Sequence, residues 1–384
     1  MAVTVGDIRT ALDAAYPPHL AHSWDRVGLI CGDPNEEVTH VSVALDCTDA
    51  VADAAIAAGS QMLVVHHPLL LRGVSTVAAD TPKGRIVHKL IRAGVALFAA
   101  HTNADAARPG VNDVLAELLG VTPGAPLGPQ NVDKLDLWAV KVPLADAEAV
   151  REAMFTAGAG ELGDYSECSF SYPGEGRFRP STDANPHLGE RGELEHVDEL
   201  KIELVAPKSR RAAVRDALIA AHPYEEPAYD IIESAVDAVP AEEQLGIGRI
   251  GELDEPMPFR DFVARVGERL PKTEWGVRGA GDPERIIRRV AVSSGSGDSF
   301  LDAATAAGVD AFVSSDLRHH PVDEALRAGA PCIVDTAHWA SEFPWCGACA
   351  DLITRETGVT ADVLTIRTDP WTVAAGATYR QEQS

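Results

Sequence analysis

Short apolar runs alternate with alanine-rich stretches along the first third of the chain. The runs at 41–46 (VSVALD), 61–65 (QMLVV) and 95–100 (VALFAA) are almost continuously apolar, which is typical of buried strands. Stretches with helical spacing follow them at 48–59, 84–94 and 111–120. We therefore expect residues 1–130 to form half of a layered α/β domain whose sheet is at least partly parallel.

The same rhythm returns near the end of the chain, after residue 251. Helices are expected at 259–270 and 299–308, and strands at 288–295, 310–315, 332–336 and 361–368. Residues 251–384 are therefore predicted to be the second half of the same α/β domain.

Between the two halves, residues 131–250 follow a different pattern. Strand-like and helical stretches succeed one another as β-α-β-β-α-β, which is the ferredoxin-like arrangement. The strands are expected at 135–143, 166–172, 198–207 and 228–234, and the helices at 145–160 and 209–221. A turn is expected at Pro173–Gly176, within a long surface loop over 173–197 that is rich in Pro, Gly and charge. We read this segment as an inserted α+β module with its own small core.

Composition limits the classes of function. The formal net charge of −25 over 384 residues repels phosphate backbones, so nonspecific nucleic-acid binding is disfavoured. The chain has no apolar run of membrane-spanning length, and its start has no signal-peptide pattern, so we expect a cytoplasmic protein without a membrane partner. A chain of this length buries a large core unaided, so any metal site is more readily explained by function than by stability.

The first chemical signal is VVHHP, in which His66 and His67 end an apolar run and Pro68 turns the chain. Neighbouring side chains of a strand point to opposite faces, so two adjacent histidines at a strand end can serve two metal ions. The alternative is a pair of ordinary loop histidines.

A second signal, AAHTNADAA, places His101 and Asp105 just after the next strand. Ligands of open α/β sheets gather beyond the carboxyl ends of strands, and a carboxylate there suits a divalent cation. Asp105 could instead cap the following helical turn, and His101 could orient substrate, act as an acid or base, or only support a ligand.

The third signal, DTAHWASEFP, follows the expected strand at 332–336. His338 and Glu342 are four residues apart and share one face of a short helix that Pro344 limits. Such a pair can hold one ion, and a carboxylate with two oxygens can bridge two; the alternative is an incidental ionic contact. Mixed N and O ligands suit zinc, manganese or iron, and hydrolytic sites of this kind hold a water between two ions.

These segments resemble a known family. VVHHPLL, HTNADAA followed by GVND, GSGDSF and DTAHWASE are similar to the motif series of the Nif-three-like dinuclear-metal-centre proteins, also named GTP cyclohydrolase type 2 homologues. YSECSF, GEGRFRP, ANPHLG and HPYEEPAYDI resemble the insert of the longer, mainly bacterial members. The resemblance spans nearly the whole chain in the right order.

The resemblance implies a ligand set and an assembly. It implies that two divalent ions are held by five side chains, with Glu342 as the bridging residue, and that the chain forms a ring-shaped homohexamer. The implied ligands are His66, His67, Asp105, His338 and Glu342. The second histidine pair, in SSDLRHHP, departs from the family pattern; there Asp316 and His320 are candidates to line the pocket, with ordinary loop residues as the alternative.

Three further patterns carry less weight. Cys346 and Cys349 have redox-motif spacing, but too little chain follows for a thioredoxin fold; an opportunistic disulfide stays open. The SSGSGDS loop lacks a P-loop lysine, and HPYEEPAYD reads better as a shaped turn than as a second metal site.

Two functions remain for the chain as a whole. The first is a metal-dependent hydrolase of a nucleotide or related phosphorylated small molecule; the family name implies opening of the guanine imidazole ring of GTP. The second is a noncatalytic hexameric metal-binding or scaffold protein. The ligand pattern fits both functions, because it does not show whether a coordination position stays open.

Overall fold

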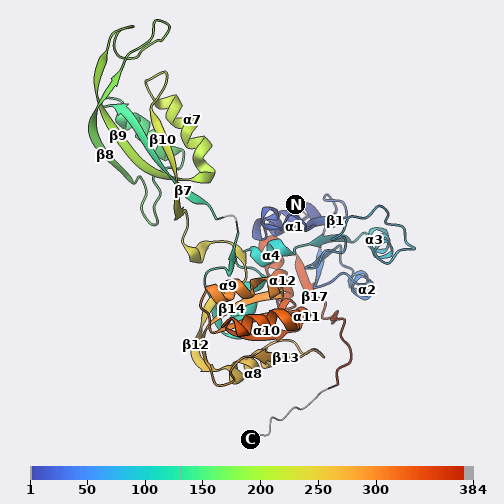
Figure 1. Cartoon of the computed structure of the whole chain (residues 1–384). Coiled ribbons are helices and arrows are strands. Elements are labelled where there is room, and N and C mark those ends of the chain that lie inside the picture. The colour runs from blue at the N-terminus through green and yellow to red at the C-terminus, as the bar shows by residue number, and fades with distance from the viewer. Residues whose placement is uncertain (1, 131, 376–384) are drawn as a thin grey trace. The chain divides into compact units, whose positions relative to one another are not determined.

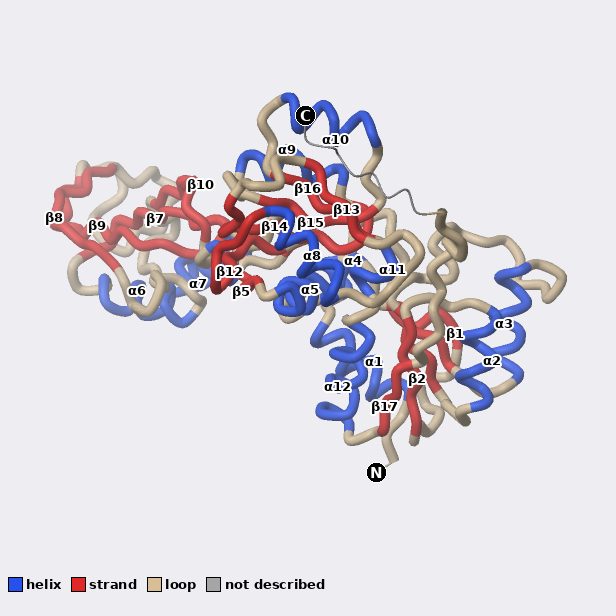
Figure 2. The backbone as a smooth tube through the Cα atoms, turned by 90° about the horizontal axis from the view of Figure 1, so that it is seen from below, coloured by secondary structure: helices blue, strands red, loops and turns tan. Residues whose placement is uncertain are grey.

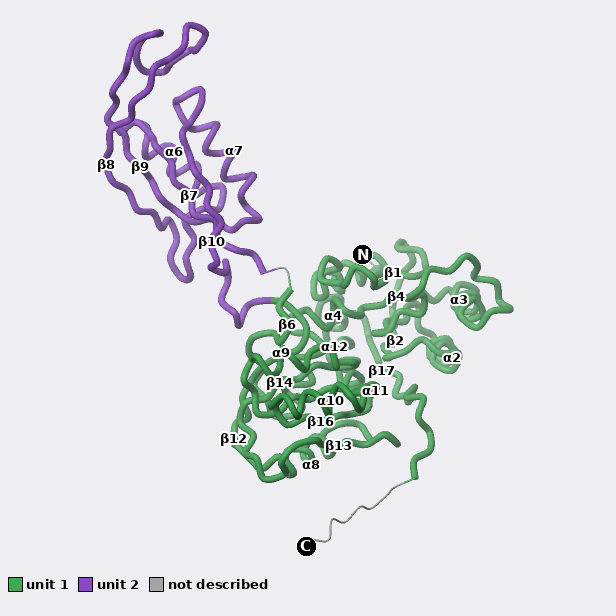
Figure 3. The backbone as a smooth tube through the Cα atoms, in the orientation of Figure 1, with its two compact units in different colours: residues 1–131, 245–384 green, residues 132–244 purple. Residues whose placement is uncertain are grey.

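The computed structural model describes residues 2–130 and 132–375. The chain divides into two compact units, one of residues 1–131 with 245–384 and one of residues 132–244 (Figure 3). The first unit thus consists of two stretches of chain that are far apart in sequence. No helix among the described residues has the length and apolar character that crossing a membrane requires.

The first sheet of the larger unit has five strands in the order β1-β4-β3-β2-β17. Strands β2, β3, β4 and β17 are parallel, and β1 is antiparallel to β4. Helices α2 and α3 cover one face, and α1 and α12 cover the other (Figure 2). The strands are β1 (Gly28–Cys31), β2 (His40–Ala44), β3 (Met62–Val65), β4 (Ala96–Ala99) and β17 (Thr360–Val363), and the helices α1 (Val5–Ala15), α2 (Asp49–Ala57), α3 (Pro82–Arg92) and α12 (Trp345–Thr357).

The second sheet has six strands in the order β13-β16-β15-β14-β12-β5, of which β14, β15 and β16 are parallel. Helices α9 and α10 lie on one face, and α5 and α8 on the other (Figures 1 and 2). The strands are β5 (Val121–Pro123), β12 (Arg249–Pro258), β13 (Val277–Ala280), β14 (Ile286–Ser296), β15 (Ala311–Ser315) and β16 (Cys332–Thr336), and the helices α5 (Val111–Leu119), α8 (Phe259–Arg269), α9 (Leu301–Ala306) and α10 (His319–Arg327).

Each half of the larger unit lends one strand to the sheet of the other half. Strand β17, from the end of the chain, pairs with β2, and β5, from the first half, pairs with β12. A short ribbon of β6 (Gly128–Pro129) and β11 (Gly246–Ile247) brings the two stretches together next to the smaller unit's ends. The predicted class, an interrupted layered α/β domain, is confirmed, with two sheets joined by exchanged strands.

The smaller unit has the predicted ferredoxin-like fold. Its four antiparallel strands have the order β10-β7-β9-β8, and both helices pack on one face around the fully buried Trp138. Residues alternate along β7, so that Trp138, Val140 and Val142 all point to this core. The elements are β7 (Lys134–Pro143), α6 (Ala147–Thr156), β8 (Ser169–Phe178), β9 (Glu195–Pro207), α7 (Arg211–Ala221) and β10 (Tyr229–Asp237).

Two predictions of local structure are wrong. The turn expected at Pro173–Gly176 is part of β8, where Pro173 pairs with Leu200 and the strand continues to Phe178. Proline is tolerated there because β8 is an edge strand, whose outward backbone groups need no ladder partner. The strand expected at 361–368 ends at Val363, and the chain continues without regular structure.

Candidate metal centre

His66 and His67 follow β3, in the middle of the first sheet. The His66 side chain is fully buried, and its Nδ1 donates to the carbonyl oxygen of Ala100 at 2.7 Å. His67 is half-buried, and its Nδ1 donates to Oδ1 of Asp46 at 2.7 Å. Because Nδ1 carries the proton in both rings, a neutral imidazole presents its Nε2 lone pair to a cation.

Asp105 lies on the short helix α4 (Thr102–Ala106), which follows β4, and His101 is the residue before this helix. His101 precedes the first helical residue, and its Nδ1 lies 2.9 Å from Oδ1 of the buried Asp25. The Asp105 side chain is 14% exposed and accepts a hydrogen bond from the Ser294 hydroxyl at 3.2 Å. Both side chains are therefore fixed by partners from distant parts of the chain.

His338 and Glu342 come from helix α11 (His338–Glu342), which follows β16 of the second sheet. Their side chains share a helix face, and Nε2 of His338 lies 3.1 Å from Oε2 of Glu342. Nδ1 of His338 donates to Oδ2 of Asp316 at 2.6 Å. After His67 and His101, His338 is thus the third histidine whose Nδ1 is held by a carboxylate.

Gly295 forms the wall of the site behind Glu342. Its φ of +59° favours glycine, and a Cβ added there would lie 2.3 Å from Oε1 of Glu342 and 3.2 Å from Nε2 of His338. The backbone of the GSGDSF segment therefore approaches Glu342 so closely that an added Cβ would displace the carboxylate.

The five residues predicted as ligands lie together, and His101 joins them. Ligand atoms fall into three groups, each with all members within 4.8 Å of one another: His66, His67 and His101; His67, His338 and Glu342; and His66, Asp105 and Glu342. The residues of the first sheet thus meet those of the second at the carboxyl ends of β3, β4 and β16.

Two buried atoms of the site test whether it suits a cation. Nε2 of His66 and Oε2 of Glu342 make no hydrogen bond among the described residues. Nε2 of His67 lies only 2.9 Å from this Oε2, yet it does not donate a hydrogen bond to it. Buried polar groups without partners are costly, and a bound divalent ion would satisfy both. The nitrogen and oxygen donors fit zinc, manganese or iron.

The charges of the site are strongly coupled. The Glu342 carboxylate raises the pKa of His338 to about 11. Burial would lower the pKa of His67, but the carboxylates of Glu342 and Asp46 outweigh it and raise that pKa to about 10. The same imidazoles hold the pKa of Glu342 well below its usual range despite burial, whereas burial raises the pKa of Asp105. Without a cation, protonated histidines would balance these carboxylates.

Several residues of the site escaped prediction from the sequence. Asp46 and Asp25 each orient one histidine, and Ser294 and Gly295 contact Asp105 and Glu342. Asp46 follows an apolar strand, as the predicted ligands do, and this position was the available signal in the sequence. Asp25 lies in an irregular loop 76 positions from His101, and nothing local marks it.

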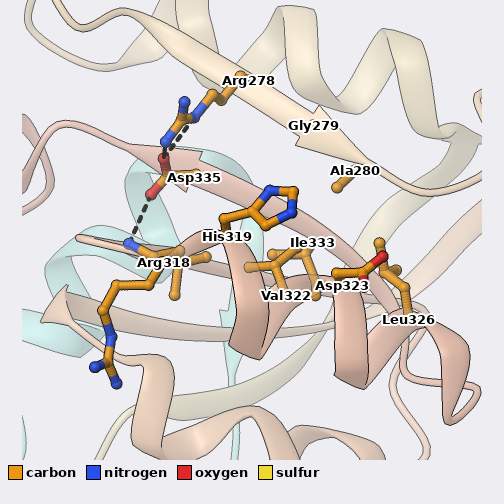
Figure 4. A pocket seen from close by; sticks show the side chains of 11 residues that line it. Arg278, Gly279, Ala280, Arg318, His319, Val322, Asp323, Leu326, Ile333 and Asp335 are labelled. Atoms are coloured by element: carbon orange, nitrogen blue, oxygen red, sulfur yellow. Dashed lines mark hydrogen bonds and ion pairs between the residues drawn. The ribbon is translucent and has the colours of Figure 1, made fainter.

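The two candidates from SSDLRHHP occupy different positions. Asp316, with a φ of +56°, turns the chain after β15 and holds His338. His320 lies exposed on α10 with its ring beside His319, outside the three ligand groups. His319 lines a pocket of about 350 Å³ between α10 and β13, where Arg278 pairs with Asp335 (Figure 4).

Cys346 and Cys349 are free thiols buried on α12, one turn apart. Burial raises the pKa of both thiols. A thiol kept protonated is a poor nucleophile, so the pair does not have the properties of a redox centre.

These features define a class: a two-sheet α/β protein with an inserted ferredoxin-like unit and a buried histidine–carboxylate cluster where the two sheets meet. The chain belongs to the family described as Duf34/NIF3 (NGG1p interacting factor 3), whose model matches residues 3–370.

Relatives and solved structures agree with this assignment. The chain is 53% identical to the GTP cyclohydrolase 1 type 2 homolog of Mycobacterium tuberculosis over 97% of each chain. It is 38% identical to the protein of the same name from Bacillus subtilis, over 93% of this chain and 95% of that protein. The crystal structure of a Bacillus cereus protein related to NIF3 matches with a TM-score of 0.70 at 34% identity, covering 97% of this chain and 100% of that one.

Proposed function

We propose that this protein is a metal-dependent hydrolase of a nucleotide or related phosphorylated small molecule, with two divalent ions held by the cluster. One observation carries the proposal. The two oxygens of Glu342 face different histidines: Oε1 lies 3.7 Å from Nε2 of His66, and Oε2 lies 2.9 Å from Nε2 of His67. A buried carboxylate placed in this way suits a bridge between two cations.

The three ligand groups suggest how the side chains divide. His66 and Asp105 would hold one ion, His67 and His338 would hold the other, and Glu342 would serve both. His101 belongs to a group with His66 and His67, and we assign it to the ligand set as a sixth member. Two bound divalent ions would supply Lewis acidity and a water with a pKa lowered toward neutrality.

The protein's own residues hold the ligands in place. Asp46, Asp316 and Asp25 accept hydrogen bonds from the Nδ1 atoms of His67, His338 and His101, which fixes the tautomer that leaves Nε2 free. In this respect three of the four histidines have the arrangement that orients ligands in metal enzymes.

The substrate class rests on the names of relatives and on the chemistry of the donors. Two adjacent divalent ions bind phosphate oxygens well, and several relatives carry the name GTP cyclohydrolase 1 type 2 homolog. We propose GTP as the first substrate to test, with hydrolysis at the carbon between the two imidazole nitrogens, and phosphoester hydrolysis as the next reaction.

Metal content and turnover test the proposal together. Protein reconstituted with manganese, zinc or iron is incubated with GTP, other nucleotides and simple phosphoesters. We expect turnover with at least one metal and its loss, with loss of bound metal, in Glu342→Gln. Glu356→Gln is the matched control, because Glu356 is an exposed carboxylate of α12; this variant should keep both turnover and bound metal. Stoichiometric metal without turnover on any substrate would instead favour a noncatalytic metal-binding protein.

We also propose a homohexamer, which the family resemblance supports. Light scattering of the metal-loaded protein should give six times the chain mass of 40.7 kDa. A smaller mass at micromolar concentration would contradict this assembly.

A further inference from the structure

A large aromatic side chain stands exposed beside the metal centre. The Trp24 side chain is 55% exposed, and its ring edge meets the His101 ring at a centroid distance of 5.9 Å and an angle of 75°. The His101 ring in turn lies 5.3 Å from that of His66 and 5.6 Å from that of His67. Trp24 is therefore one ring away from the proposed ligands.

His22 extends the aromatic surface. Its ring stacks on Trp24 with a centroid distance of 5.6 Å and an interplanar angle of only 9°. The two rings form a parallel, offset pair, which is a geometry that aromatic rings prefer in contact with other aromatic rings. Trp24 is not part of any of the three groups of possible ligands, so holding a metal ion does not explain why a tryptophan stands here.

The loop that carries both rings is tied to the helix that carries Asp105. Asp25 is buried and accepts hydrogen bonds from the backbone N–H and the hydroxyl of Thr102 on α4. The Thr102 hydroxyl oxygen accepts a hydrogen bond from the backbone N–H of His22 at 3.0 Å. Asp25 also accepts from Nδ1 of His101. The position of Trp24 is thus set by the same bonds that orient a proposed ligand.

We propose that Trp24, supported by His22, is a positioning residue that stacks on the planar base of a nucleotide substrate. Stacking would hold the base at the edge of the centre while the rest of the nucleotide reaches the cluster. This inference rests on the proposed function for the substrate class, but its test measures binding and does not need turnover. Base–aromatic stacking is strong and tolerates different bases, so it selects for an aromatic ring rather than for guanine.

The test compares a nucleotide with its base-free counterpart. Metal-loaded protein is titrated with GMP, AMP and ribose 5-phosphate in a calorimeter. We expect the wild type to bind GMP and AMP on the order of tenfold more tightly than ribose 5-phosphate. Trp24→Leu should lose this preference, Trp24→Phe should keep most of it, and affinity for ribose 5-phosphate should stay the same in all three.

Trp371→Leu is the matched control, because Trp371 is 57% exposed and its ring packs against Trp275. It should bind all three compounds like the wild type. The proposal is overturned if Trp24→Leu binds GMP as the wild type does, or if the wild type shows no preference for compounds with a base. A changed oligomeric state in Trp24→Leu with unchanged GMP affinity would also overturn it, since Trp24 would then cover another copy of the chain.

The outcomes of the two proposals are separable. If the wild type prefers GMP to ribose 5-phosphate, Trp24→Leu loses this preference, and no substrate is turned over, the proposed hydrolase activity is refuted and the stacking role of Trp24 is supported. If a nucleotide is turned over and Trp24→Leu changes neither KM nor kcat, the hydrolase proposal is supported and the stacking role of Trp24 is refuted.

Discussion

A methyl group at residue 295 would collide with the Glu342 carboxylate unless that side chain moved. Five of the six proposed ligands are recognisable in the sequence because histidines and carboxylates stand out after apolar strands. Gly295, Asp46 and Asp25 are not recognisable as parts of the site, because their roles depend on which distant residue each one meets. Residue type is visible in the sequence, whereas pairing across the fold is not.

Gly295→Ala tests the close approach. We expect it to weaken metal binding at least tenfold, because the added Cβ would lie 2.3 Å from Oε1 of Glu342. Gly308→Ala is the control: it has a similar φ of +65° but nothing within 4 Å of its Cβ position. Gly308→Ala should lose about 1 kcal/mol of unfolding free energy in urea, because it strains an L-residue, and Gly295→Ala should lose at least as much. Equal metal content in the two variants would contradict the role of Gly295.

Asp46→Asn tests the orientation of His67. We expect the affinity for metal, measured by chelator competition, to fall by roughly 10-fold to 100-fold, because Asn accepts the Nδ1 proton more weakly. Asp362→Asn removes the carboxylate 2.9 Å from Nε2 of His40, outside the cluster, and should leave the affinity unchanged. If the two variants behaved alike, Asp46 would have no particular role in the centre.

At the scale of elements, short apolar strands followed by polar residues indicated where the cluster lies, because each proposed ligand follows a strand directly or lies on or beside the short helix after it. Strands β3, β4 and β16 were all expected close to their observed positions. Which sheet a strand joins was not predictable, since pairing between β17 and β2 or between β5 and β12 has no local signature. The full length of β8 was not predictable either, because Pro173 indicates a turn unless the strand is known to lie at the edge of its sheet.

A buried ion pair between Asp113 of α5 and Arg249 of β12 joins two elements of the larger unit, and its contribution to stability can be tested. Arg249 is fully buried, and its guanidinium makes two hydrogen bonds to Asp113, at 2.8 and 2.7 Å. Asp113→Asn should lower the unfolding free energy in urea by about 3 kcal/mol, because it leaves a buried guanidinium without a counter-charge. Asp323→Asn, which removes an exposed partner of Arg327, should change it by less than about 0.5 kcal/mol. A difference of under about 1 kcal/mol between the variants would contradict this account.

At the scale of the whole molecule, all six proposed ligands lie in the larger unit. The smaller unit is a continuous segment with its own core. Residues of the larger unit close to its two ends are hydrogen-bonded to each other: the backbone N–H of Gln130 donates to the carbonyl oxygen of Leu245 at 2.8 Å. The change of rhythm in the sequence predicted this insertion, because a self-contained core requires its own alternation of strands and helices.

Replacing residues 132–244 by a short Gly–Ser linker should therefore leave the metal centre intact. We expect the shortened chain to bind as many metal ions as the full chain, and the separate smaller unit to bind none while folding cooperatively. Glu342→Gln in the shortened chain is the control and should remove the metal. A folded shortened chain without metal would show that the inserted unit contributes to the centre.

The exchanged strand β17 has a consequence for how the protein is made. Translation supplies residues from the amino terminus onward, so β2 remains an open sheet edge until residues 360–363 leave the ribosome. The helix that carries His338 and Glu342 emerges only shortly before. A nascent chain therefore holds at most four of the six proposed ligands through most of its synthesis, and the cluster is completed only when residues 338–342 have been added.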